Sequence, residues 1–127
     1  MRAKPMEPER GPPLDLVHLA RQCQCDAGLQ DELLRQFRLQ SRALWSQLSE
    51  PPARTLAEKA RIAHTLCGSA LAVGAGRVAE AARRLENEIR AALEEAPTKA
   101  RRSRRALAAL DASVSEAIAE IERIQVI

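Results

Sequence analysis

Apolar residues recur every three or four positions along most of this chain, a spacing that places them on one face of an α-helix. Four long segments show this period, at residues 29–48, 53–71, 77–93 and 107–124, and a shorter one covers 14–22. The expected core positions are Leu14, Val17 and Leu19; Leu33, Leu34, Phe37, Leu44, Trp45 and Leu48; Leu56, Ala60, Ala63, Cys67 and Ala70; Val78, Ala82, Leu85, Ile89 and Leu93; and Leu107, Leu110, Val114, Ala117, Ile118, Ile121 and Ile124.

The breaks between these segments coincide with residues that end helices. Pro51 and Pro52 follow the first long segment, small residues at 72–76 follow the second, and Pro97 precedes the last. No proline interrupts a periodic segment, and Asp26 is suited to cap the first long helix. Because short connections make successive helices antiparallel, we predict an all-α fold: an antiparallel four-helix bundle with a short additional N-terminal helix.

Length and composition agree with one helical domain. The chain has 127 residues, enough for one core and too few for two. Residues 1–13 are rich in proline and charge and are expected to form a disordered leader, and residues 14–127 to form the bundle domain. The chain is 46% hydrophobic but only 2% aromatic, so its core must be aliphatic, which favours closely packed helices over sheets.

Charge and cysteine content bear on which partners the protein binds and on the compartment in which it works. The formal net charge of +3 comes from 20 basic and 17 acidic residues and does not by itself indicate a nucleic-acid binder. The basic stretch 99–105 lacks interleaved aromatic residues, so a solvated helix start is favoured over a contact with nucleic acid or anionic lipid. His18, Cys23 and Cys25 do not match common zinc spacings, and no metal site is expected. Three cysteines, with no signal peptide or membrane span, predict a cytoplasmic protein with reduced thiols.

One segment, residues 63–70, departs from simple core patterning. His64 is rotated by about 100° from the inward-facing Ala63, so its ring is expected at the border of the buried stripe, in water. Gly68 lies one turn further on the same face. A glycine inside a helix costs about 1 kcal/mol relative to alanine, and the compensating benefit would be room for another surface to approach the imidazole.

A histidine side chain at this position suits reversible phosphoryl transfer. It is largely neutral near pH 7, and a ring nitrogen can act as the nucleophile. Arg61, one turn before His64, and Arg77 or Arg84 on the next helix are candidates to offset phosphate charge. On the histidine alone, a surface residue without chemistry is the simpler interpretation, and for Cys67 a small core residue is favoured.

The same segment resembles the signature of the histidine-containing phosphotransfer (HPt) domain family, His-x-Leu-Lys-Gly-Ser-Ala-x-x-x-Gly-Ala. Residues 64–70 read His-Thr-Leu-Cys-Gly-Ser-Ala, and Gly74-Ala75 follow at the family spacing. Leu85-Glu86 resembles the family's Leu-Glu pair, the 33–48 segment its second helix, and Leu14-Asp15-Leu16 its opening. The resemblance spans residues 14–124 and favours His64 as a phosphoacceptor.

The resemblance implies a phosphocarrier rather than an autonomous kinase. His64 would exchange phosphoryl groups between a sensor histidine kinase or receiver domain and a response regulator. Gly68 would open access, Leu71 with nearby small residues would dock the receiver, and Arg61 would steady the charge. No cofactor is expected on this chain, since Mg²⁺ belongs to the partner receiver, and family members of this type are expected to be monomers.

One position departs from the family pattern. The lysine that the family carries three residues after its histidine is replaced by Cys67, which supplies no positive charge. Either transfer relies on a nearby arginine, or this is a degenerate HPt-like module that binds a receiver or kinase without phosphotransfer.

Overall fold

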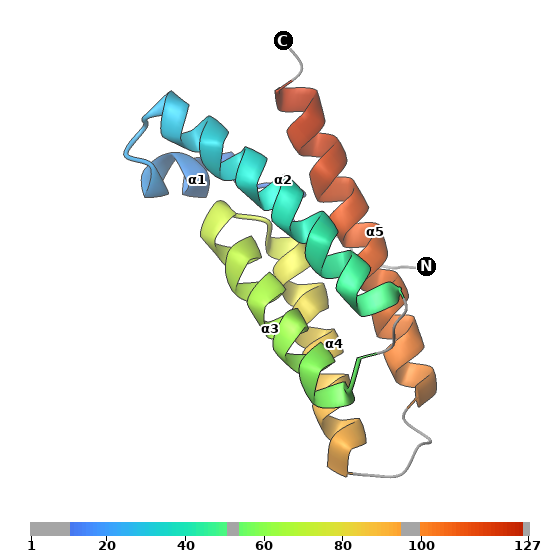
Figure 1. Cartoon of the computed structure of the whole chain (residues 1–127). Coiled ribbons are helices and arrows are strands. Elements are labelled where there is room, and N and C mark those ends of the chain that lie inside the picture. The colour runs from blue at the N-terminus through green and yellow to red at the C-terminus, as the bar shows by residue number, and fades with distance from the viewer. Residues whose placement is uncertain (1–10, 51–53, 95–99, 126–127) are drawn as a thin grey trace, which may run out of the picture.

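The computed structural model describes residues 11–50, 54–94 and 100–125, and for residues 100–103 it describes the backbone only. These described residues form five helices and no strand. The helices are α1 (Leu16–Gln22), α2 (Ala27–Ser49), α3 (Leu56–Val73), α4 (Gly76–Glu94) and α5 (Ala100–Ile124). The four long helices run alternately up and down, and α1 lies near the end of the bundle where α3 turns into α4 (Figure 1). The predicted fold class is confirmed. Residues 1–10 of the expected leader lie outside the described residues.

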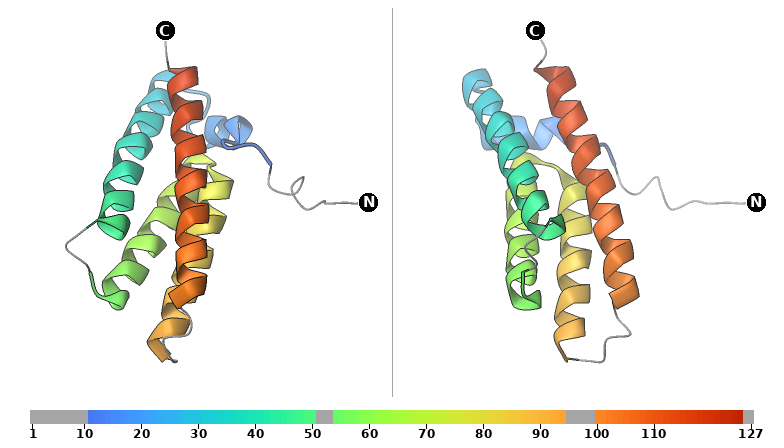
Figure 2. Two further views of the ribbon diagram at one scale, coloured as in Figure 1. Left: turned by 90° about the vertical axis from the view of Figure 1, so that its right-hand side faces the viewer. Right: turned by 45° about the vertical axis from the view of Figure 1, so that its right-hand side comes forward.

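The four long helices enclose one aliphatic core. The most extensive packing is between α3 and α4, followed by α4 with α5 and α2 with α3, while α2 and α5 close the ring through a smaller contact (Figure 2). Most predicted core residues are buried, among them Leu34, Phe37, Leu85, Leu110 and Ile121. In this ring order, the seam between α3 and α4 lies opposite the seam between α2 and α5.

The prediction of a core position is wrong for three residues, which are exposed. Val17 is 62% exposed, because the short α1 turns only the Leu19 side toward the bundle. Leu56 and Leu93 are 40% and 49% exposed, because they lie at the first turn of α3 and the last turn of α4, where the core ends. Leu66 is fully buried although it was not expected to be. The helix α3 packs on both α2 and α4, so its buried face is wider than a single stripe.

Local hydrogen bonds explain where the helices begin and end. The Asp26 side chain accepts from the Leu29 backbone N–H and caps α2, as predicted. Thr55 and Glu58 form a capping box at the start of α3. Gly74 ends α3 in the left-handed conformation at φ +81°, which glycine adopts without strain. The predicted small-residue turn is thus only two residues long, Gly74 and Ala75.

The α3–α4 turn also holds α1. The Asp15 backbone N–H donates to the Gly74 carbonyl at 2.8 Å, and His18 Nε2 donates to the Leu71 carbonyl at 3.1 Å. These two contacts seat α1 beside the C-terminal end of α3. These contacts therefore hold α1 close to the exposed face of α3 that carries His64.

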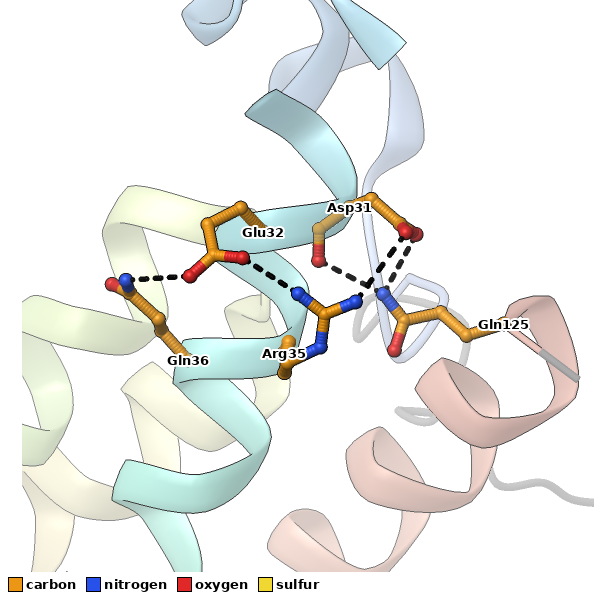
Figure 3. A network of polar contacts seen from close by, with 5 residues as sticks. All are labelled: Asp31, Glu32, Arg35, Gln36 and Gln125. Atoms are coloured by element: carbon orange, nitrogen blue, oxygen red, sulfur yellow. Dashed lines mark hydrogen bonds and ion pairs between the residues drawn. The ribbon is translucent and has the colours of Figure 1, made fainter. Parts of the chain in front are cut away.

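A polar network joins the first turns of α2 to the end of α5 (Figure 3). Gln125 Nε2 donates to the Asp31 carbonyl at 2.9 Å and to Asp31 Oδ1 at 2.8 Å. Arg35 pairs with Glu32 at 2.6 Å and reaches Asp31 at 3.8 Å. The two Arg35 ion pairs lie within α2 and their groups are about half exposed, so each contributes little free energy. The link between α2 and the end of α5 in this network is the pair of bonds from Gln125 to Asp31.

Candidate functional site

His64 lies near the middle of α3 with its side chain 73% exposed, as the sequence predicted. Its Nδ1 donates to Glu86 Oε1 of α4 at 3.2 Å. An ionised carboxylate only accepts hydrogen bonds, so in the neutral form of the ring the proton is assigned to Nδ1 and the lone pair to Nε2. The neutral imidazole therefore presents an unprotonated nitrogen at the surface of the bundle.

Glu86 is the partner that sequence reasoning missed. The antiparallel α3–α4 hairpin brings it to the histidine: His64 is ten residues before Gly74, and Glu86 is ten residues after Gly76. This symmetry about the turn was the available signal, since residues equally far from a short helical turn lie opposite each other. Only 12% of the Glu86 side chain is exposed, so the carboxylate is recessed beside the far more exposed ring.

Arg90, one turn after Glu86, holds the second carboxylate oxygen. Its Nε and Nη2 lie 2.9 Å and 2.8 Å from Glu86 Oε2, while His64 contacts Oε1. Burial raises the pKa of Glu86, but the hydrogen bonds from Arg90 and His64 outweigh burial and hold that pKa below the ordinary value of 4.5. The carboxylate is thus anionic at neutral pH and joins the imidazole to the guanidinium.

The arginines named from the sequence lie differently. Arg61 is exposed one turn before His64, on the same side of α3. Arg77 was a wrong candidate, because its guanidinium bonds Glu116 of α5 at 2.9 Å and the Gly11 carbonyl at 2.8 Å. Arg84 is also unsuitable, because it precedes Glu86 by two residues and so faces about 200° away around α4. The cation in contact with the pair is Arg90.

The remaining predicted site residues are distributed around the histidine. Gly68 is exposed, and a Cβ added to it would meet nothing within 4 Å, so its surface is open. Cys67 is 8% exposed and belongs to the core, in agreement with its interpretation as a small core residue. Leu71 is 50% exposed and lies on the His64 face two turns further along α3, next to α1. This face of α3 is therefore open at Gly68 and partly apolar at Leu71.

Other candidate sites receive little support. Within the described residues, no three His, Cys, Asp or Glu side chains gather to hold a metal ion. Arg104 and Arg105 of the basic stretch are exposed, and the other basic side chains of residues 99–105 lie outside the described part of the chain. None of the helices in the described ranges combines the length and apolarity needed to span a bilayer.

A protein-family model for the Hpt domain matches residues 32–123, which covers most of the chain and runs from α2 almost to the end of α5. The chain belongs to the Hpt domain family. No curated protein and no solved structure matches this Hpt chain. Hpt domains carry phosphoryl groups on histidine in phosphorelays and interact with kinases and response-regulator receivers, so this is the general role of the protein. The matched region contains His64, Glu86 and Arg90, and α1 precedes it.

Proposed function

We propose that His64 is the phosphoacceptor of this Hpt domain and passes the group between a sensor histidine kinase or receiver and a response regulator. The observation that carries the proposal is the imidazole that is 73% exposed with Nδ1 bonded to Glu86. A surface histidine without chemistry needs no recessed carboxylate to fix its tautomer. The chain has only two histidines, and the other, His18, is engaged in seating α1.

The proposed step is an in-line attack by Nε2 on a phosphoryl group. The Nε2–P bond forms as the P–O bond to the partner's aspartyl carboxylate breaks, and that carboxylate leaves with the electron pair. The ring becomes positively charged and keeps its proton on Nδ1, where the Glu86 carboxylate stabilises the new charge. The reverse reaction returns the group to a receiver aspartate. This chain supplies a positioned nucleophile, and the partner receiver supplies Mg²⁺.

Access for the partner is the second part of the proposal. The open surface at Gly68 lets a receiver approach the ring, and the half-exposed Leu71 supplies apolar contact beside it. Arg61 lies on the same face and attracts the phosphoryl group. A cytoplasmic, monomeric phosphocarrier without a cofactor of its own remains our expectation.

The direct test is incubation with a phosphorylated receiver or an active sensor kinase. Acid-labile label is expected on the wild-type chain and on His18→Gln, and none on His64→Gln. Peptide mapping of the labelled protein identifies the modified ring. Equal labelling of wild type and His64→Gln would end the proposal.

A non-transferring docking module is the alternative, and it is favoured by the buried Cys67, which stands where the family carries a lysine. It predicts receiver binding without labelling, and binding that survives His64→Ala. A Cys67→Lys variant extends a flexible stem that can carry its ammonium to the surface. Transfer that arises only in Cys67→Lys would support the docking module, whereas transfer by the wild type would reject it.

A further inference from the structure

The carboxylate beside His64 has two opposed electrostatic effects. It stabilises the positive ring that forms on phosphorylation, but it also repels the phosphoryl group, which carries about −1.5 to −2 charges near pH 7. The lowered pKa of Glu86 keeps this repulsion in force at neutral pH. Cys67 offers no positive charge to offset it. An Hpt domain of this sequence therefore needs a cation at the carboxylate itself.

The side chain of Arg90 meets that need by its geometry. The carboxylate is divided between two partners, with Oε1 on His64 Nδ1 at 3.2 Å and Oε2 on Arg90 Nε and Nη2 at 2.9 Å and 2.8 Å. Two N–H donors on one oxygen both orient the carboxylate and offset its charge. The Arg90 side chain is 54% exposed, so this cation lies at the surface from which a phosphoryl donor arrives.

We infer that Arg90 is a positioning residue for phosphotransfer, which acts through Glu86 by offsetting the carboxylate charge and fixing its orientation toward His64. The inference rests on the proposed function of His64. It assigns to α4 the charge compensation that a lysine at position 67 of α3 would give by family resemblance. In this arrangement Arg61 attracts the phosphoryl group from α3, whereas Arg90 offsets the charge of the Glu86 carboxylate from α4.

The test uses phosphoramidate, a small phosphoryl donor that needs no docking surface. Nε2 attacks phosphorus, the P–N bond of the donor breaks, and ammonia leaves. Arg90→Ala is expected to label about tenfold more slowly, the order expected when one charge is removed close to the reacting group. Arg90→Lys should recover most of the rate. Arg83→Ala is the matched control, because Arg83 is exposed one turn before Glu86 on the same helix, and its rate should stay within about twofold.

A double-mutant cycle shows whether Arg90 acts through Glu86. In a Glu86→Gln background there is no carboxylate charge to offset, so adding Arg90→Ala should change the labelling rate by less than about twofold. An equal slowing by Arg90→Ala in both backgrounds would mean that the guanidinium acts on the phosphoryl group directly. That outcome would overturn the inference, as would a wild-type rate in Arg90→Ala itself.

A titration of the unphosphorylated protein separates this inference from the proposed function. Besides Glu86 itself, helix spacing places the ionisable side chains of His64 and Arg61 from α3 and of Arg83 and Arg90 from α4 on this face. Followed by carbon NMR, the Glu86 carboxyl should titrate at higher pH in Arg90→Ala and should be little changed in Arg83→Ala. Absence of label on wild type would reject the proposed function and this role with it. If the wild type is labelled and Arg90→Ala is labelled at the same rate, the inference about Arg90 is rejected and the proposed function is not.

Discussion

His64 and Glu86 are 22 positions apart in the chain, yet His64 Nδ1 and Glu86 Oε1 are separated by only 3.2 Å. The two side chains differ sharply in exposure, at 73% for the histidine and 12% for the glutamate. The carboxylate therefore holds the ring from the protein side and leaves Nε2 for a partner.

Removal of the carboxylate should change the histidine tautomer. In Glu86→Ala the hydrogen bond that favours the proton on Nδ1 is lost, so we expect a larger share of rings protonated on Nε2, and these rings cannot attack phosphorus through Nε2. Nitrogen NMR of the ring measures the tautomer ratio directly. Glu80→Ala, at an exposed position of the same helix, is the control. An unchanged ratio in Glu86→Ala would mean that Glu86 does not set the tautomer.

The same carboxylate should make stability depend on pH in the acidic range. The folded-state pKa of Glu86 lies below the ordinary value of 4.5, so the folded protein binds fewer protons than the unfolded chain between these two values. The contribution of Glu86 is therefore complete above pH 4.5 and is lost as pH falls through the lowered pKa.

The measurement is urea unfolding of wild type and Glu86→Gln between pH 3 and 7, for which we expect a stability difference that shrinks on acidification by no more than about 1 kcal/mol. The bound is small because the Arg90 partner is half exposed and screened. A difference that grows as pH falls would contradict the assigned direction of the pKa shift.

Gly68 should be a position where stability and partner access conflict. A Cβ there meets nothing within 4 Å, so Gly68→Ala should raise the free energy of unfolding by about 1 kcal/mol through helix propensity. Labelling by phosphoramidate should be unchanged, whereas transfer from a receiver domain should slow, and Gly68→Leu should slow it further. Gly76→Ala, equally open but at the start of α4, is the control for transfer. Unimpaired receiver transfer in Gly68→Leu would refute the docking role of this surface.

Gly74 should tolerate no side chain. It has φ +81°, and an added Cβ would lie 2.8 Å from the Asp15 backbone oxygen. Gly74→Ala is therefore expected to lose about 2 kcal/mol or more, from left-handed strain plus this contact. Gly11→Ala separates the two causes, because φ is +71° there but the space is open. Hydrogen exchange should show α1 loosened in Gly74→Ala only, and equal protection of α1 in both variants would contradict this account.

The sequence predicted the number and order of the helices because each one carries an apolar period that ends at a capping or helix-breaking residue. The capping role of Asp26 and the break at Gly74 follow from local chemistry alone. The errors at Val17, Leu56 and Leu93 have a common source. Periodicity shows which side of a helix is apolar but not where the neighbouring helices end, so residues at the margins of the core are not resolved by it.

His64 and the surface at Gly68 were also recognisable from sequence, because their positions on one helix depend only on 3.6 residues per turn. Arg77 was misassigned because its face of α4 is turned toward α5, which no pattern within α4 reveals. The experiments above address the functional roles that remain predictions, namely those of His64, Arg61, Cys67, Gly68 and Leu71.

By itself, the sequence determined the helices, their faces and the exposed histidine, since these follow from interactions between residues a few positions apart. Only the tertiary structure decided that Glu86 meets His64 and that Arg90 holds Glu86. Those contacts depend on the rotation and register of α4 against α3, which the packing of the whole core fixes and which no local pattern encodes.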